Sequence, residues 1–325
     1  MPCYRGYPFF DLWHHTNKFY YSFVYILICD LELKNINVLI GSNGAGKSNF
    51  ISIFEMLQKI LVRELAFYTG KKGISSLFYN GKKVTDRISA EFFFGGDIYY
   101  YEVEWTENDS LLFRTESFNV AGYELLGEGE HRESNALNTL HQMGGVVIPK
   151  AMLNPSWRIY QFHDTSPSSR IKSEHNISNC KFLVGDASNL AAFLYRLCEH
   201  FPTEYEKILK VVQRVAPFFK DFELLPREHN DEQIVLRWIQ NDYDGILTPS
   251  QLSDGTLRFI CLATLLLQPA SLQPATIIID EPELGLHPYA ITIFAELVKK
   301  SSCQKANNLS YTVFPLNFAP NFWCG

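Results

Sequence analysis

One eight-residue segment, Gly41–Ser48, constrains the fold of this chain more than any other part of the sequence. It reads Gly-Ser-Asn-Gly-Ala-Gly-Lys-Ser and fits the pattern G-x-x-x-x-G-K-[ST]. Glycines at these places let backbone N–H groups turn toward one point, where they surround the oxygen atoms of a phosphate. The pattern works only between a buried strand and a helix, so it predicts an α/β fold.

The flanking residues supply that context. Residues 36–40 read as a short buried strand, and residues 48–66 carry apolar side chains at helical spacing. The positive end of this helix would point at the bound anion. We therefore expect Lys47 to contact the β- and γ-phosphates of ATP, and the Ser48 hydroxyl to ligate Mg²⁺. The predicted nucleotide-binding residues of this segment are Gly41, Ser42, Asn43, Gly44, Ala45, Gly46, Lys47, Ser48 and Asn49.

A second apolar strand ends in two carboxylates. Residues 276–279 read Thr-Ile-Ile-Ile and are followed by Asp280 and Glu281. Ligands of parallel sheets bind at the carboxyl ends of the strands. Asp280 would hold Mg²⁺, and Glu281 would orient or deprotonate the water that attacks the γ-phosphate. The alternative is an Asp-Glu pair that only ends a strand.

The other elements are predicted from periodicity. Residues 74–126 alternate and are rich in aromatic and β-branched side chains, which indicates an antiparallel meander. The apolar run 19–29 is shorter than the ~20 residues that span a bilayer, and its composition favours a buried strand. Further strands are expected at 157–162 and 311–314, and helices at 189–200, 204–215, 256–267 and 289–300.

Composition limits the partners and the compartment. The net charge of −6 gives no overall basic field, so any DNA contact would need a local patch or a partner. The 7 cysteines are scattered and form no C-x-x-C pair, which favours a reduced, cytoplasmic chain. We expect no membrane insertion.

The segment Leu252-Ser253-Asp254-Gly255-Thr256 stands directly before an apolar helix. It admits two interpretations. Its polar groups could present an anion site at the N-terminus of the helix. It could instead be an ordinary capping sequence, with Ser253 or Asp254 as the N-cap and Gly255 in a turn. The residues alone favour capping.

The order of these three segments resembles the Walker A, LSxG signature and Walker B motifs of ABC-type ATPases. The strings 253–259 and 280–288, together with Phe162-His163-Asp164-Thr165-Ser166, resemble a family of prokaryotic AAA-family ATPases related to the RecF and SMC heads. The similarity extends over about residues 30–300. It implies a P-loop NTPase fold, with an ABC-type ATPase head, an antiparallel β subdomain and a small helical lobe. It also implies an ATPase that acts as an ATP-dependent dimerisation switch in DNA maintenance or anti-phage defence.

In that class two heads enclose ATP between them. The resemblance therefore implies a homodimer in which Ser253, Asp254 and Gly255 contact the nucleotide of the partner. Gln161 would sense Mg²⁺ and the attacking water, although a single glutamine after a strand is commonly a surface residue. Residues 284–288 would contact the partner, and His287 could instead be structural. DNA as a ligand rests on the resemblance alone.

The resemblance divides the chain into five parts. They are an atypical N-terminal segment (1–29), an ATP-binding lobe with the β subdomain (30–162), a helical lobe (163–250), a core with the signature helix and Walker B (251–300), and an atypical tail (301–325). Neither end carries the sequence expected of relatives, which suggests truncation or a frameshift. We expect a central strand to be missing, with an exposed sheet edge and impaired hydrolysis.

Two other functions fit parts of the sequence. The chain could be the nucleotide-binding subunit of a membrane transporter, although the β-rich stretch before Gln161 is longer than such subunits carry. It could also be a remnant that binds nucleotide without hydrolysing it, which the unusual ends suggest.

Overall fold

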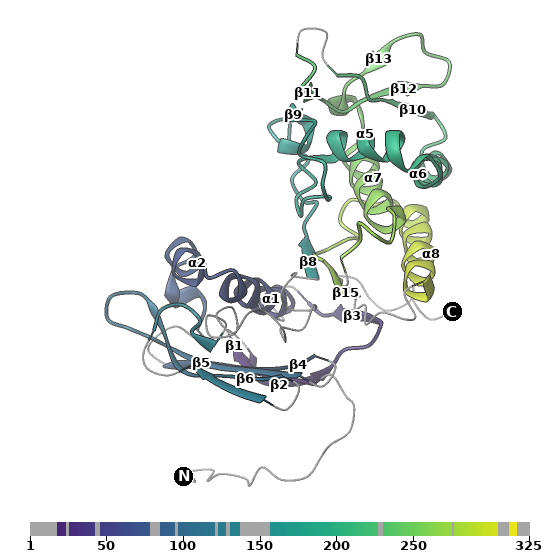
Figure 1. Ribbon diagram of the computed structural model, residues 1–325. Helices are drawn as coiled ribbons and strands as arrows, with labels where there is room; N and C mark the ends of the chain where they lie inside the picture. The colour runs from purple at the N-terminus through teal and green to yellow at the C-terminus, as the bar shows by residue number, and fades with distance from the viewer. Residues whose placement is uncertain are drawn as a thin grey trace. The chain divides into compact units, whose positions relative to one another are not determined.

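The computed structural model describes residues 18–23, 26–42, 46–78, 85–94, 97–120, 123–127, 131–136, 157–226, 230–274, 276–304 and 312–316. The chain divides into two compact units (Figure 1). The first unit comprises residues 1–32 and 62–149, and the second comprises residues 33–61 and 150–325. Each unit has its own sheet.

The first unit is built on a six-stranded antiparallel sheet, as the alternating pattern of residues 74–126 predicts. Along the sheet the strands are β2 (Ile26–Glu32), β1 (Lys18–Phe23), β4 (Arg87–Phe94), β5 (Asp97–Trp105), β6 (Leu111–Val120) and β7 (Tyr123–Gly127). On β5, Tyr99, Tyr101 and Val103 are buried, whereas Tyr100 and Glu102 between them are partly exposed. One face of this strand therefore forms core.

The apolar run 19–29 forms two strands and not the single strand that we predicted. β1 and β2 pair antiparallel, with Phe23 opposite Ile26, so the run folds back on itself. β1 also pairs with β4, which makes it an internal strand of the sheet. The reversal has no Gly, Pro, Asn or Asp to mark it, and such residues are the signals from which a turn is predicted.

The predicted helix over 48–66 is interrupted. α1 (Lys47–Leu61) ends before Arg63, whose φ of 58° is left-handed and terminates the helix. α2 (Leu65–Lys72) then begins, followed by the short helix η1 (Ile74–Ser76). The Glu133 carboxylate accepts hydrogen bonds from the first two N–H groups of α2, at Leu65 (3.2 Å) and Ala66 (3.0 Å).

A buried carboxylate holds the chain after β7 against β6. Glu116, 1% exposed, accepts hydrogen bonds from the Tyr99 hydroxyl (2.7 Å) and the Ser134 hydroxyl. It also accepts from the backbone N–H groups of Asn135 (2.9 Å) and Ala136 (3.0 Å). Four donors around one carboxylate fix this segment in place.

Replacing Glu116 by alanine is therefore expected to lower the free energy of unfolding by about 3–5 kcal/mol, because the four donors lose the buried acceptor that they share. Urea unfolding followed by tryptophan fluorescence would measure the change. The matched control is Glu104→Ala on β5, which removes a surface ion pair with Arg114 (2.7 Å) and should cost under about 1 kcal/mol. Equal effects of the two substitutions would contradict the structural importance of Glu116.

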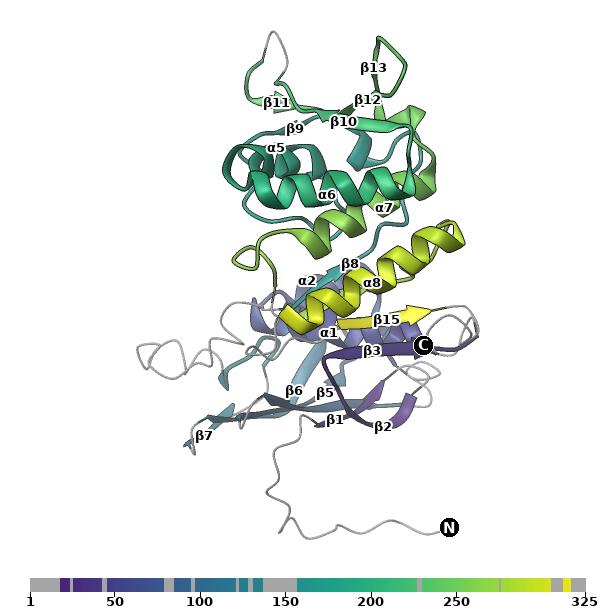
Figure 2. The same ribbon diagram turned by 90° about the vertical axis from the view of Figure 1, so that its right-hand side faces the viewer.

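The second unit contains a four-stranded parallel sheet. Its strands are, in order, β3 (Ile36–Ile40), β15 (Thr312–Leu316), β14 (Thr276–Ile279) and β8 (Trp157–Tyr160). Figure 2 shows β15 lying along β3. The expectation of a missing central strand is therefore wrong, because residues 312–316 fill the place between β3 and β14.

Helices and small strands complete the second unit. The helices are α5 (Leu190–His200), α6 (Pro202–Val215), α7 (Asp254–Leu267) and α8 (Pro288–Gln304), with the short helices η2 (Arg170–Lys172) and η3 (Pro249–Gln251). The remaining strands are β9 (His175–Asn176), β10 (Phe219–Glu223), β11 (Gln233–Ile234), β12 (Arg237–Gln240) and β13 (Ile246–Leu247). The four predicted helices after residue 188 are confirmed in type and approximate position.

One continuous apolar core joins these elements. α7 is buried along most of its length, and buried residues of α5 and α6 belong to the same cluster. The rings of Phe219 and Trp238 stack 5.5 Å apart within it. Among the described residues, no helix is both long and apolar enough to span a membrane.

Candidate functional site

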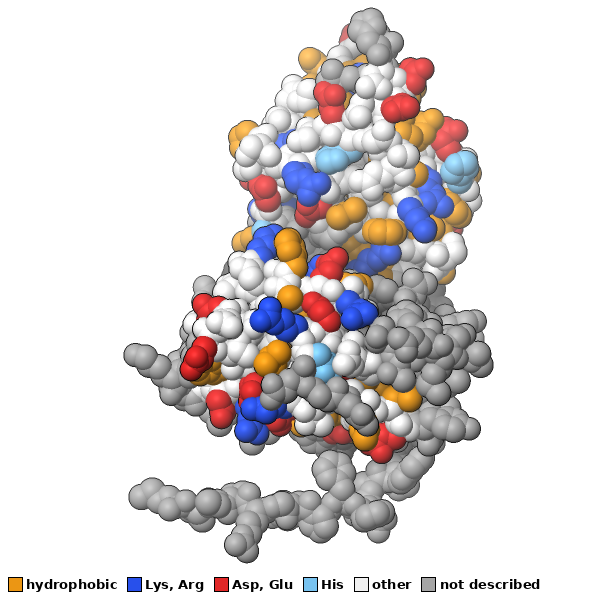
Figure 3. Space-filling view, turned by 60° about the vertical axis from the view of Figure 1, so that its left-hand side comes forward, with side chains coloured by type: hydrophobic (Ala, Val, Ile, Leu, Met, Phe, Trp, Pro, Cys, Tyr) orange, Lys and Arg blue, Asp and Glu red, His pale blue; other side chains and the backbone are white. Residues whose placement is uncertain are grey.

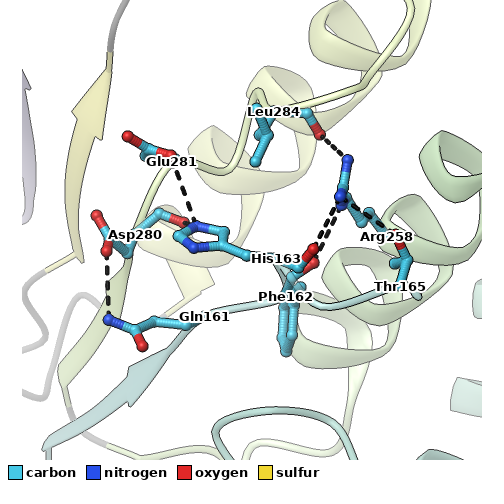
Figure 4. Close-up of polar contacts among 8 residues, drawn as sticks. All are labelled: Gln161, Phe162, His163, Thr165, Arg258, Asp280, Glu281 and Leu284. Carbon is cyan, nitrogen blue, oxygen red and sulfur yellow. Dashed lines mark hydrogen bonds and ion pairs between the residues drawn. The ribbon is translucent and has the colours of Figure 1, made fainter. Parts of the chain in front are cut away.

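The carboxyl edge of the parallel sheet brings together two predicted site residues that are far apart in sequence. β14 pairs with β8 so that Ile279 lies opposite Tyr160, and the Asp280 N–H donates to the Tyr160 carbonyl (2.9 Å). The next residue after β8 is Gln161. Its side-chain amide donates to Asp280 Oδ2 at 3.2 Å (Figure 4).

Asp280 is buried with an incomplete set of partners. The residue is 8% exposed, and its Oδ1 atom accepts no hydrogen bond from the described residues. Burial raises the pKa of Asp280, and the charge of Glu281 adds to this, whereas His163 and Gln161 oppose it. The Asp280 carboxyl group therefore holds its proton more tightly in the folded protein than in the unfolded chain. Its ionisation as the pH rises lowers the stability of the fold. A cation beside Oδ1 would offset that cost, so the site fits Mg²⁺.

Glu281 occupies an unusual backbone conformation. Its φ is 43°, in the left-handed region that non-glycine residues seldom adopt, and such conformations are frequent at functional sites. The His163 ring contacts both carboxylate residues. Its Nε2 atom is 3.0 Å from the Asp280 carbonyl oxygen and 3.9 Å from Glu281 Oε2. Glu281 is partly exposed (29% of its side chain), so a water molecule can reach it.

The phosphate loop has the strand–loop–helix context that its pattern requires. β3 ends at Ile40 and α1 begins at Lys47, with no acidic residue in its first turn to repel an anion. Lys47 Nζ donates to the carbonyls of Gly41 (2.6 Å) and Ser42 (2.8 Å), and Gly46 has a left-handed φ of 91°. Ser48 and Asn49 follow in the first turn of α1. Asn43, Gly44 and Ala45 lie outside the described residues.

The signature segment, residues 252–255, leads into α7, which begins at Asp254. Ser253 is the N-cap: its Oγ accepts from the Thr256 N–H (3.1 Å). The capping interpretation thus describes the local structure, and it leaves Ser253 and Asp254 exposed. Gly255 is required at its position for a steric reason. A Cβ there would lie 2.4 Å from the Gly285 carbonyl oxygen, so only glycine permits this approach of two backbones.

Two residues near this edge had no predicted role. His163 belongs to the string 162–166 that carries the resemblance, and its position just beyond a predicted strand end was the available signal. Arg258 lies one turn into α7 and belongs to the string 253–259 that also carries the resemblance, but the sequence predicts no role for it. Its guanidinium donates to the carbonyls of Phe162, His163 and Leu284 and to the Thr165 hydroxyl (Figure 4).

Few of the described side chains at the carboxyl edge of the parallel sheet could ligate a metal ion. Within the described residues, no group of three or more His, Cys, Asp or Glu side chains is arranged to hold a metal ion. A site that binds Mg²⁺ mainly through phosphate oxygens and water needs only one or two protein ligands, and Asp280 and Ser48 are of the right type.

Comparison with known proteins identifies the family. A family model described as "AAA domain, putative AbiEii toxin, Type IV TA system" matches residues 36–309. Comparison with curated proteins gives no match.

Solved structures with a similar fold are SMC heads. One is the SmcHead bound to the C-winged helix domain of ScpA, at 15% identity with a TM-score of 0.55, covering 93% of this chain and 89% of that one. Another is an Smc head domain with an extended coiled coil bound to the C-terminal domain of ScpA derived from Pyrococcus furiosus, at 14% identity with a TM-score of 0.55 and the same coverage. The predicted fold, a P-loop NTPase with an ABC-type head and an antiparallel sheet, is confirmed.

Proposed function

Since the chain belongs to the AAA domain family described as putative AbiEii toxin, we propose that it binds and hydrolyses ATP and that ATP binding drives its dimerisation. The observation that carries the proposal is the arrangement at the ends of β8 and β14. Gln161, Asp280 and Glu281 meet at the edge of a parallel sheet, where ligands of such folds bind.

Each residue has a role in the proposed reaction. Lys47 contacts the β- and γ-phosphates, and the backbone of Gly41–Ser48 surrounds them. Glu281 orients or deprotonates the attacking water, a role that its partial exposure supports. Gln161 lies close enough to Asp280 to orient both the water and the cation.

Mg²⁺ would be held by Ser48 and Asp280, with Gln161 beside them. When bound, Mg²⁺ neutralises charge on the phosphate oxygens. The buried Oδ1 of Asp280, which has no hydrogen-bond partner within the described ranges, supports this assignment.

The proposed dimer places the signature segment of one copy against the nucleotide of the other. Ser253 and Asp254 are exposed at the N-terminus of α7, as a contact to a partner's nucleotide requires. Leu284 and Tyr289 on the neighbouring loop and helix are also exposed, at 41% and 48%, and supply apolar surface for association. The proposal keeps the domain boundaries predicted from the resemblance. In it, residues 163–250 form the helical lobe, which separates the two parts of the ATPase core in the sequence.

The biological setting rests on resemblance. DNA maintenance or anti-phage defence, in the cytoplasm, is the setting that we propose for the switch. Among the described side chains on the face in Figure 3, Lys and Arg are interspersed with Asp and Glu. The alternative of a remnant that binds nucleotide without hydrolysing it has less support than the sequence alone suggests. It is motivated by a missing central strand, and β15 supplies that strand.

Replacing Asp280 by asparagine tests the proposed site. Mg²⁺-dependent phosphate release should fall by about a hundredfold or more, because the anionic ligand is lost. The melting temperature of the nucleotide-free protein should rise by about 2–4 °C, because a buried charge has been removed. Phosphate release with Mg²⁺ or EDTA, and thermal unfolding without nucleotide, measure the two effects.

The matched control is Asp244→Asn in the exposed turn between β12 and β13, which should change neither quantity. Turnover by the Asp280→Asn protein at the wild-type rate would exclude the proposed role of this edge. If EDTA left ATP turnover by the wild type unchanged, a requirement for Mg²⁺ would be excluded.

A further inference from the structure

We propose that Arg258 is a positioning residue for hydrolysis, which locks the segments carrying the catalytic side chains to the first turns of α7. This inference rests on the proposed function. It adds a residue outside the phosphate loop, the signature segment and the acidic strand end, and a physical connection between the signature segment and the water-activating carboxylate of the same chain.

The Arg258 guanidinium makes four hydrogen bonds in two directions. Toward the segment after β8, Nε donates to the Phe162 carbonyl (3.1 Å), and Nη2 donates to the His163 carbonyl (2.8 Å) and the Thr165 hydroxyl (3.2 Å). Toward the loop after β14, Nη1 donates to the Leu284 carbonyl (3.2 Å). The planar fork of arginine suits this geometry, whereas the single ammonium of lysine does not reproduce it.

Both segments that Arg258 holds carry site residues. The segment after β8 contains Gln161 and His163, and the loop after β14 begins with Asp280 and Glu281. The two segments meet through Gln161, whose amide donates to Asp280, and through His163, whose ring lies 3.0 Å from the Asp280 carbonyl and 3.9 Å from Glu281. By fixing the His163 backbone, Arg258 fixes the ring that contacts both carboxylate residues.

The packing around Arg258 leaves little space for independent movement. A Cβ on Gly255 would lie 2.4 Å from the Gly285 carbonyl oxygen, and a Cβ on Gly285 would lie 2.3 Å from Arg258 Nη1. Gly285 also has a left-handed φ of 71°. The start of α7, the loop after Glu281 and the guanidinium are therefore in direct contact.

A functional consequence follows from this contact. In the proposed dimer, the signature segment engages the nucleotide of the partner, whereas Glu281 acts on the nucleotide of its own chain. A shift at the N-terminus of α7 would move Arg258 and, through its hydrogen bonds, both loops. Arg258 thus connects engagement of one nucleotide with the geometry of hydrolysis at the other.

The test compares Arg258→Lys, which keeps the charge but not the fork, and Arg258→Gln with the wild type. We expect both variants to lower kcat by about 10- to 100-fold, because small misplacements of reacting groups have effects of this size. The Kd for ATP should stay within about threefold, because lost positioning acts on the transition state and not on binding. The control is Arg214→Gln on α6, which removes an exposed ion pair with Glu296 (3.6 Å) and should change neither constant.

Hydrogen exchange supplies a readout that does not depend on turnover. The amides of Leu284 and Leu286 are hydrogen-bonded within the loop after Glu281, to Glu281 O and Glu283 O (both 3.1 Å). In Arg258→Gln these amides and those of residues 162–166 should exchange about tenfold faster, whereas β10 and β12 should be unchanged.

The outcomes separate the two proposals. Absence of ATP turnover by the wild type would refute the proposed function, and the exchange pattern would still decide whether Arg258 holds the loops. Wild-type kcat in Arg258→Lys and Arg258→Gln, or unchanged exchange in both loops, would overturn the positioning role. A parallel loss of kcat, ATP affinity and melting temperature would also overturn it, because that pattern indicates general unfolding.

Discussion

Replacing Lys47 by alanine is expected to weaken ATP binding by about a hundredfold or more, because charge-assisted hydrogen bonds to phosphate oxygens each contribute about 1.5–3 kcal/mol. Lys47 is the first residue of α1, and its ammonium already donates to two carbonyls of the loop. It would exchange these acceptors for the β- and γ-phosphates. Isothermal titration with a slowly hydrolysed ATP analogue would measure the change in Kd.

The control for Lys47→Ala lies on the same helix. Lys59 is in the last turn of α1, so Lys59→Ala removes an equal charge and tests for a general effect of reduced charge. Only the Lys47 variant should lose affinity. Tight ATP binding that survives Lys47→Ala would exclude Gly41–Ser48 as the phosphate loop.

Glu281→Gln should lower ATP turnover by about a hundredfold or more while nucleotide binding persists, because glutamine keeps the shape of the side chain and removes the base. A protein that binds ATP without hydrolysing it should also accumulate in its ATP-bound form. If ATP is the contact between two heads, the variant should elute as a stable dimer with ATP and Mg²⁺. Light scattering coupled to size-exclusion chromatography would show the doubled mass.

The control for Glu281→Gln is Glu296→Gln on α8. Glu296 forms only a half-exposed ion pair with Arg214, so its loss should leave turnover and mass at their wild-type values. A Glu281→Gln protein that hydrolyses ATP at the wild-type rate would exclude Glu281 as the base. A Glu281→Gln protein that is inactive and stays monomeric with ATP would support the role of Glu281 in hydrolysis. It would contradict the dimerisation switch.

The parts of the site that follow from local patterns could be predicted from the sequence. The phosphate loop and the apolar strand before Asp280 are each contained within a few consecutive residues. The contact between Gln161 and Asp280 then follows from a general rule, since the carboxyl ends of neighbouring parallel strands meet at one edge.

Arg258 could not be predicted in the same way. Its acceptors are mostly backbone carbonyls, which every residue possesses, and they lie 95 or 96 residues away at His163 and Phe162. Nothing in the apolar helix around Arg258 distinguishes it from an arginine that extends into solvent.

A strand at 311–314 is predicted from the sequence, but its composition obscures the central place of β15 in the sheet. Residues 312–316 include Pro315, and proline lacks the N–H that a central strand uses for pairing. The structure accommodates it because β14 pairs only with Thr312 and Val313, before the proline. On its other side, β15 pairs with β3 along its full length.

The position of β15 also determines when the parallel sheet can be completed during synthesis. β3 and β14 both pair with β15 and not with each other, so β3 cannot be joined to the β8–β14 pair until residues 312–316 have left the ribosome. Pairing residue 36 with residue 312 closes a very long loop, and such long-range contacts are slow to form. The phosphate-loop segment and every helix of the described residues precede β15 in the chain, which therefore depends on the last described strand to join the two halves of the site.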